Sequence, residues 1–63
     1  MTIKQAKQVL NIEEDEEVDK VELTYFGKLL RAQLNDSNLK RYDRYLKETK
    51  LNACIVLYTG KEI

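Results

Sequence analysis

Three groups of side chains in this sequence have types and spacings that could do chemistry, and the first is a single thiol. Cys54 is the only cysteine and the chain has no histidine. A cysteine becomes a nucleophile when a neighbour such as histidine lowers its pKa, and one thiol supports neither an internal disulfide nor a four-ligand zinc site. We therefore expect Cys54 to be a small apolar residue, buried or at an interface. The sequence predicts no enzymatic activity, no cofactor and no metal site.

The second group is a run of five consecutive acids at residues 13–17. One interpretation is a solvated loop that leads into the acidic first turn of a helix, where negative charge suits the helix dipole. The other is an acidic patch that recruits a basic partner, carried by Glu13, Glu14, Glu16 and Glu17. The run lacks the alternating acids and turn glycine of a calcium-binding loop.

The third group is a series of basic residues, spaced along one face of a predicted helix. They are Lys40, Arg41, Arg44 and Lys47, with Lys50 one turn further on. Three interpretations remain open: a solvated helix face, a contact with DNA or RNA, and a contact with an acidic protein. Eleven basic residues balance eleven acidic ones, whereas nucleic-acid-binding domains usually carry a basic excess, so DNA binding is the alternative rather than the preferred function.

These groups must be positioned by helices, because the chain has no proline and two glycines in 63 residues. Residues 18–34 read as a helix with two apolar stripes. The first comprises Val18, Val21, Tyr25, Leu29 and Ala32, and the second comprises Leu23, Phe26, Leu30 and Leu34. A surface helix needs a stripe only about 100° wide. We therefore expect this helix to be central and covered by two neighbours.

A short helix is predicted before it and a long one after it. Thr2 and Gln5 have the spacing of a capping box, and Asn11 suits the left-handed conformation that ends a helix. This first helix is expected to dock on one stripe of the central helix. We expect Asp36 or Ser37 to cap the third helix and Gly60 to end it. A β-strand over residues 53–58 is the alternative to its last turns.

The last turns of the third helix are apolar on every side. Leu51, Cys54, Ile55 and Tyr58 continue the face that earlier carries the basic residues. Three helices offer few ways to cover so much apolar surface, and exposed apolar patches on small domains mark interfaces. We therefore predict that these four residues contact another protein, with a symmetric homodimer as the simplest form.

Cellular location is indicated by absences in the sequence. Lys4 and Lys7 interrupt the N-terminal region, so we expect no signal peptide, and no segment reaches the apolar length of a membrane span. A lone thiol favours the reducing cytoplasm. Residues 1–63 are expected to form one small helical domain with no membrane contact. Such a short, charged chain would suit a phage or mobile-element regulator.

The order of predicted elements resembles the J-domain of Hsp70 co-chaperones. Residues 5–12 are similar to the end of the family's first helix, and Tyr25, Leu29 and Leu30 look like residues of its second helix. The family stimulates Hsp70 through a His-Pro-Asp motif after that helix. Here the corresponding residues are Leu34, Asn35 and Asp36, so the resemblance implies a degenerate J-like domain without that activity.

The sequence thus predicts an all-α, three-helix domain with a short first helix and two long antiparallel helices. Its predicted function is that of a non-enzymatic regulator or adaptor. It would dimerise or bind a larger protein through the C-terminal helix, and the acidic run or the basic face would steer the encounter. The alternative function is DNA binding through the basic face of the third helix.

Overall fold

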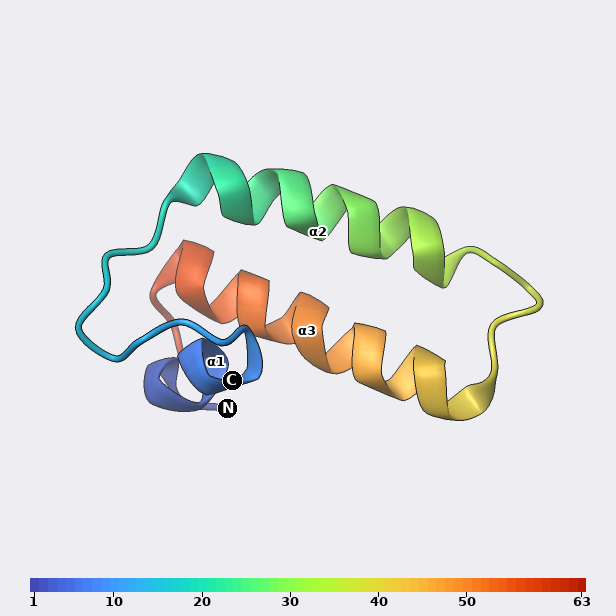
Figure 1. Cartoon of the computed structure of the whole chain (residues 1–63), viewed down its shortest axis with the longest axis horizontal. Coiled ribbons are helices and arrows are strands. Elements are labelled where there is room, and N and C mark those ends of the chain that lie inside the picture. Colours follow the sequence, from blue (N-terminus) through green and yellow to red (C-terminus); the bar gives the residue numbers. More distant parts are fainter.

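A computed structural model describes residues 1–63 and consists of three helices with no strand (Figure 1). They are α1 (Ile3–Val9), α2 (Lys20–Leu34) and α3 (Arg41–Thr59). The two long helices run antiparallel, and the short α1 lies beside the C-terminal end of α3. The prediction of an all-α fold is confirmed. Residues 53–58 lie inside α3, so the strand alternative is wrong.

Local hydrogen bonds explain where α1 begins and ends. The Thr2 hydroxyl accepts from the Gln5 amide, and the Gln5 side chain accepts from the Thr2 amide, which completes the predicted capping box. At the other end Asn11 has a φ of 59°. The Asn11 amide donates to Gln8 O and the Ile12 amide donates to Lys7 O. This pair of bonds is a Schellman motif, which returns the chain toward the helix.

The ends of α2 lie close to their predicted places. Asp19 is the N-cap, and its carboxylate accepts from the Val21 amide at 2.9 Å. A carboxylate at this position also interacts favourably with the helix dipole. Val18 therefore precedes the helix rather than belonging to it. At the other end α2 stops at Leu34, with Asn35 as its C-cap.

The start of α3 differs from the prediction. It begins at Arg41 after Lys40, which makes no side-chain cap bond, and not after Asp36 or Ser37. The Asp36 carboxylate accepts instead from the Asn38 amide, which folds the connection into a turn. Because that side chain is used in the loop, the helix starts several residues later. The other end was predicted correctly, since Gly60 adopts a φ of 70° there.

Helix α3 lies in the middle of the packing, and the expectation that residues 18–34 form the central helix is wrong. Both α1 and α2 pack against α3, and the two do not pack against each other. On one side Ala6 of α1 meets Ala53 and Val56, and on the other Leu23 and Leu30 of α2 meet Cys54. Leu10, which caps α1, contacts both groups. The chain thus encloses two small apolar clusters, one on each side of α3.

The two ends of the chain meet beside α1 (Figure 1). The Ile63 amide donates to Met1 O at 3.1 Å, and the Met1 amino group donates to Ile63 O. Met1 also packs on the cluster formed by α1 and α3. None of the three helices combines the length and the apolar character needed to cross a bilayer.

Candidate interaction surface

Helix α2 covers most of the surface that the sequence predicted to bind a partner. Cys54 is 4% exposed and packs against Leu23 and Leu30. Leu51 is half-buried against the same cluster. The expectation that these side chains remain uncovered is therefore corrected. It assumed that α2 needs two neighbours, whereas α3 has two and turns this face toward α2.

Tyr58 is the part of this surface that solvent still reaches. It is 50% exposed, and the Lys20 ammonium lies 5.6 Å from the centre of its ring, within the range of a cation–π interaction. Ile55 is half-buried beside it. Both line a shallow hollow of about 400 Å³ between α2 and α3. A role for these two residues in binding a partner stays a prediction.

The Cys54 thiol is in an environment that suppresses its reactivity. Desolvation by burial raises its pKa above the ordinary value of 9.0, although a hydrogen bond from its own backbone amide opposes this shift. A raised pKa keeps the thiol neutral at physiological pH, and the thiolate is the reactive form. Nowhere in the chain do three or more His, Cys, Asp or Glu side chains gather so that they could hold a metal ion.

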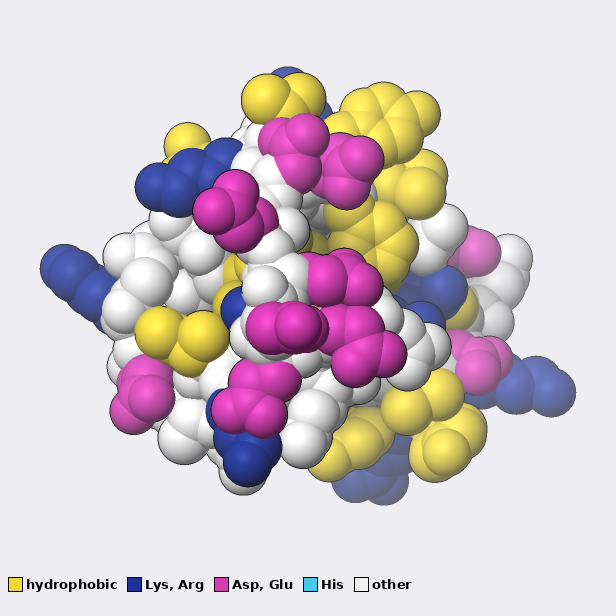
Figure 2. Space-filling model, turned by 60° about the vertical axis from the view of Figure 1, so that its left-hand side comes forward, with side chains coloured by type: hydrophobic (Ala, Val, Ile, Leu, Met, Phe, Trp, Pro, Cys, Tyr) yellow, Lys and Arg dark blue, Asp and Glu magenta, His cyan; other side chains and the backbone are white.

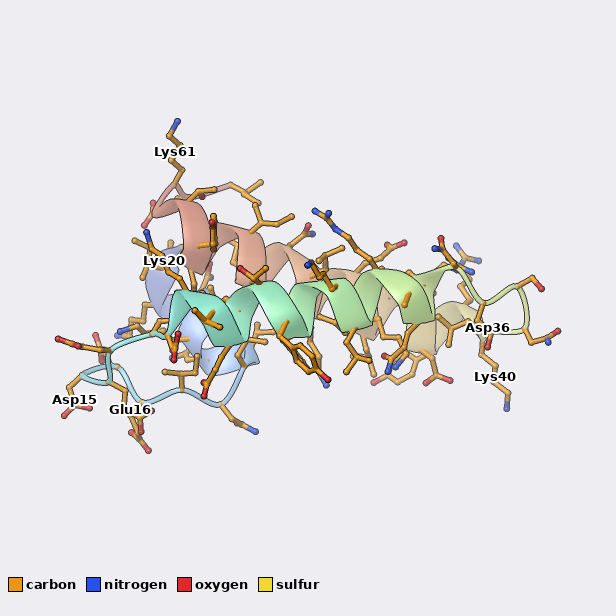
Figure 3. The ribbon with its side chains drawn as sticks, turned by 90° about the horizontal axis from the view of Figure 1, so that it is seen from above. Asp15, Glu16, Lys20, Asp36, Lys40 and Lys61 are labelled. Carbon is orange, nitrogen blue, oxygen red and sulfur yellow. The ribbon has the colours of Figure 1, made fainter.

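The carboxylates of residues 13–17 are all exposed. We call this segment the acidic loop. Figure 3 shows Asp15 and Glu16 projecting from it away from the helices. Lys7 of α1 binds the loop through its backbone. Its ammonium donates to the carbonyls of Glu14 and Glu16, each at 2.9 Å, and not to their carboxylates. The loop is therefore held in place by its backbone, while its negative charges stay available in solvent.

Two of the basic residues of α3 bind their own chain. The Arg44 guanidinium donates to Leu34 O at 2.9 Å and to Asp36 O at 3.2 Å. The Lys47 ammonium donates to the Gln33 side chain at 2.9 Å. These bonds join the start of α3 to the end of α2. Lys40 and Arg41 are exposed, and Lys40 lies at the end of the molecule opposite Asp15 and Glu16 (Figure 3).

The most exposed apolar surface belongs to α2, where sequence reasoning expected a second neighbour. Val21 is 77% exposed and Tyr25 is 74% exposed, and both belong to the first stripe. The second stripe faces α3, with Leu23 and Leu30 buried. Composition carried a signal for this choice, because the second stripe holds only large hydrophobic residues whereas the first includes Ala32 and a tyrosine.

Beside this stripe lies a groove of about 640 Å³, which the sequence did not predict. It runs between the chain that ends α1 and the first half of α2. Most of its lining is apolar: Val9, Leu10, Ile12, Val21, Leu23, Tyr25 and Phe26. Asp19, Glu22 and Lys50 also line it. Figure 2 shows hydrophobic side chains gathered beside acidic ones on this side of the molecule.

The chain matches no protein-family model, and neither a curated protein nor a solved structure is significantly similar to it. The functional interpretation therefore rests on this chain's own surface.

Proposed function

We propose that this chain is a non-catalytic module that binds another protein through the outer face of α2. The observation that carries the proposal is the high exposure of Val21 and Tyr25, one turn apart on the same face. A large side chain left in solvent gains about 1.5–3 kcal/mol when it is fully buried. Adjacent exposed apolar residues next to a groove are typical of surfaces that a partner covers.

A binding role rather than a catalytic one is supported by the residues available. The chain has no histidine, and its one thiol is buried with a raised pKa. General acid–base catalysis at neutral pH would then depend on a carboxylate or lysine with a strongly shifted pKa. A buried, unpaired thiol also suits the reducing cytoplasm, where we place the protein.

The resemblance to J-domains supports a regulator or adaptor. A short helix followed by two long antiparallel helices is compatible with that layout, and Leu34-Asn35-Asp36 replaces the His-Pro-Asp motif. We propose a degenerate J-like domain that does not stimulate Hsp70. An Hsp70 ATPase assay with the purified chain is expected to show the basal rate, and a stimulated rate would contradict this part of the proposal.

Matched surface variants test the binding role. The bait proteins are the parent chain, a Val21→Ser/Tyr25→Ser variant and a Tyr42→Ser/Tyr45→Ser variant. Tyr42 and Tyr45 are also exposed, at 70% and 64%, but lie on α3. Proteins captured from native lysate by the parent and the α3 variant, but not by the α2 variant, are the expected result. Identical capture by all three baits would overturn the proposal.

The earlier prediction about the C-terminal helix is tested in the same experiment. Tyr58→Ser removes the exposed part of that surface and leaves Cys54 in place. If Tyr58→Ser and not the α2 variant abolishes capture, the contact lies on the α3 side of the molecule and the α2 surface is the wrong assignment. Circular dichroism of each bait checks that all remain helical.

A further inference from the structure

The groove at the start of α2 lies next to the strongest negative charge of the molecule. The acidic loop begins directly after Ile12 and ends two residues before Asp19, and both of these residues line the groove. The loop therefore connects two residues of the groove lining. Asp19 and Glu22 add two carboxylates to the lining, and Lys50 is the one basic residue there. A ligand in this groove would meet an apolar floor and an acidic rim.

The exposure of the groove walls argues against a small molecule. Ligand pockets typically bury about 70–90% of the ligand's surface. Here Val21 and Tyr25 stand mostly in solvent, so a small molecule in the groove would stay exposed along one side. A longer partner that continues over α2 would cover both the groove and these two side chains.

The secondary structure selects the form of that partner. A peptide that adds a strand needs an open sheet edge, and this chain has no strand. The two aromatic side chains of the groove, Tyr25 and Phe26, both come from α2, and the wall opposite them is aliphatic, whereas polyproline ligands dock in grooves lined by aromatic side chains. An amphipathic helix, with apolar side chains at positions i, i+3, i+4 and i+7, is the form that fits.

We propose that this groove binds an amphipathic helix of another protein, with its apolar face in the groove and its Lys and Arg residues toward the acidic loop. The inference rests on the proposed function and names the class of partner. The loop suits this role because Lys7 anchors its backbone through two carbonyls and leaves the carboxylates in solvent. Opposite charges at the rim also speed association.

A second copy of this chain is the main competing occupant, because α3 is itself basic near its start. The structure disfavours it. Arg44 and Lys47 already donate to the end of α2, and the next turns of α3 are buried at Ala53 and Cys54. Helix α3 could enter another copy's groove along its length only by leaving its own fold.

Two synthetic peptides test the proposal directly. Both are about 15 residues long, roughly the shortest length that is helical in water, and share one pattern of leucines at i, i+3, i+4 and i+7. One carries Lys at all flanking positions and the other carries Glu. Fluorescence anisotropy with the full chain is expected to show binding of the Lys peptide, weakened by added salt, and none of the Glu peptide.

Variants of the protein locate the binding. Val21→Ser/Tyr25→Ser is expected to lower the affinity for the Lys peptide by about tenfold or more, because two apolar contacts are lost. Tyr42→Ser/Tyr45→Ser, on α3, is the matched control and is expected to change affinity by less than about twofold. Glu13→Gln/Glu17→Gln is expected to reduce the salt dependence without changing the helix content.

Three results would overturn this inference: no binding of the Lys peptide, equal binding of both peptides, or unchanged binding to the α2 variant. Sedimentation adds a fourth, a parent dimer that Val21→Ser/Tyr25→Ser dissociates, because the occupant would then be a second copy. These failures are distinguishable from failure of the proposed function. If the α2 variant still loses lysate partners while the Lys peptide does not bind, the surface stands and its partner has another chemistry.

Discussion

The two halves of α3 belong to one continuous helix but are stabilised differently. In the C-terminal half Ala53, Cys54 and Val56 are buried between α1 and α2. In the N-terminal half Tyr42 and Tyr45 are exposed. The difference follows from length, since the seven residues of α1 span about 10 Å and the nineteen of α3 span about 28 Å at 1.5 Å per residue. Helix α1 can therefore cover only part of α3, and the buried residues it contacts, Ala53 and Val56, lie in the C-terminal half.

In the N-terminal half of α3, which we call the open half, polar bonds take the place of burial. We call the C-terminal half the closed half. Arg44 reaches two carbonyls at the end of α2, and Lys47 reaches Gln33. Such bonds contribute less each than a buried apolar side chain, because the groups exchange water for protein partners. We therefore expect substitutions of apolar residues to lower the free energy of unfolding strongly in the closed half and little in the open half.

The largest effect is expected from a charge placed in the closed half. Ala53 has no exposed surface and contacts Ala6 and Val56. An unpaired carboxylate there costs about 3–5 kcal/mol, comparable to the whole stability of a domain this small. Ala53→Asp is therefore expected to unfold the chain, as judged by far-ultraviolet circular dichroism.

Tyr42→Asp is the matched control, because Tyr42 lies about three turns earlier on the same face of α3. It is 70% exposed, and the variant is expected to stay folded. If both variants unfold, or if neither does, coverage by α1 is not what distinguishes the two halves.

A smaller effect is expected on α2, where one of two adjacent leucines is buried and the other is exposed. Leu30 is buried against Leu23 and Cys54, so Leu30→Ala is expected to lower the free energy of unfolding by about 2–5 kcal/mol. Leu29 is 45% exposed, and Leu29→Ala is expected to cost less than about 1 kcal/mol. Urea denaturation followed by circular dichroism measures both. Equal losses of unfolding free energy would contradict the assignment of the second stripe as the face that packs against α3.

The polar attachment of the open half predicts a moderate effect. Arg44→Ala removes two charge-assisted bonds to Leu34 O and Asp36 O and is expected to cost about 1–3 kcal/mol. Arg41→Ala, at an exposed neighbour, is expected to stay within about 0.5 kcal/mol of the parent. Arg44→Lys should not restore stability, because an ammonium lacks the fork that reaches both carbonyls. Urea midpoints that rank these variants otherwise would show that this end is not held by Arg44.

The smallest effect concerns pH and the thiol of the closed half. Burial raises the Cys54 pKa above 9.0 in the folded chain, so the unfolded chain loses this proton first as pH rises. The contribution to stability is present below the unfolded pKa and is lost as pH rises through the folded pKa. Urea midpoints between about pH 8 and pH 11 should fall more steeply for the parent than for Cys54→Ala. If the two variants show parallel curves of urea midpoint against pH, burial does not disfavour the Cys54 thiolate in the folded chain.

The helix ends could be predicted where a cap forms within a few residues. Thr2 with Gln5, Asn11 and Gly60 each make or permit a bond to a residue close by in the sequence. The start of α3 could not be predicted this way. The Asp36 side chain could cap a helix or close a turn, and it closes a turn with the Asn38 amide. Arg44 of α3 then binds the Asp36 carbonyl across the loop. The deciding contact joins two elements.

The candidate site shows the same division. Sequence reasoning found the acidic loop, the lone buried thiol and the excess of apolar surface. It placed that surface on α3 at Leu51, Cys54, Ile55 and Tyr58. Of these four only Tyr58 is largely exposed, and Val21 and Tyr25 of α2 are more exposed still. The groove could not be predicted from the sequence because its main walls are residues 9–12 and the first half of α2, which are separated by the acidic loop.

The sequence by itself determined that this protein has three helices, and where most of them begin and end. Helix caps and backbone bonds connect neighbours along the chain, so local residue types suffice to specify them. Only the tertiary structure decided which apolar stripes face inward. Both long helices have two candidate faces, and the choice depends on which helix α1 packs against. With α1 docked on α3, Ala53 and Val56 are buried on one side of α3 and Cys54 is buried under α2 on the other, which leaves Val21 and Tyr25 in solvent.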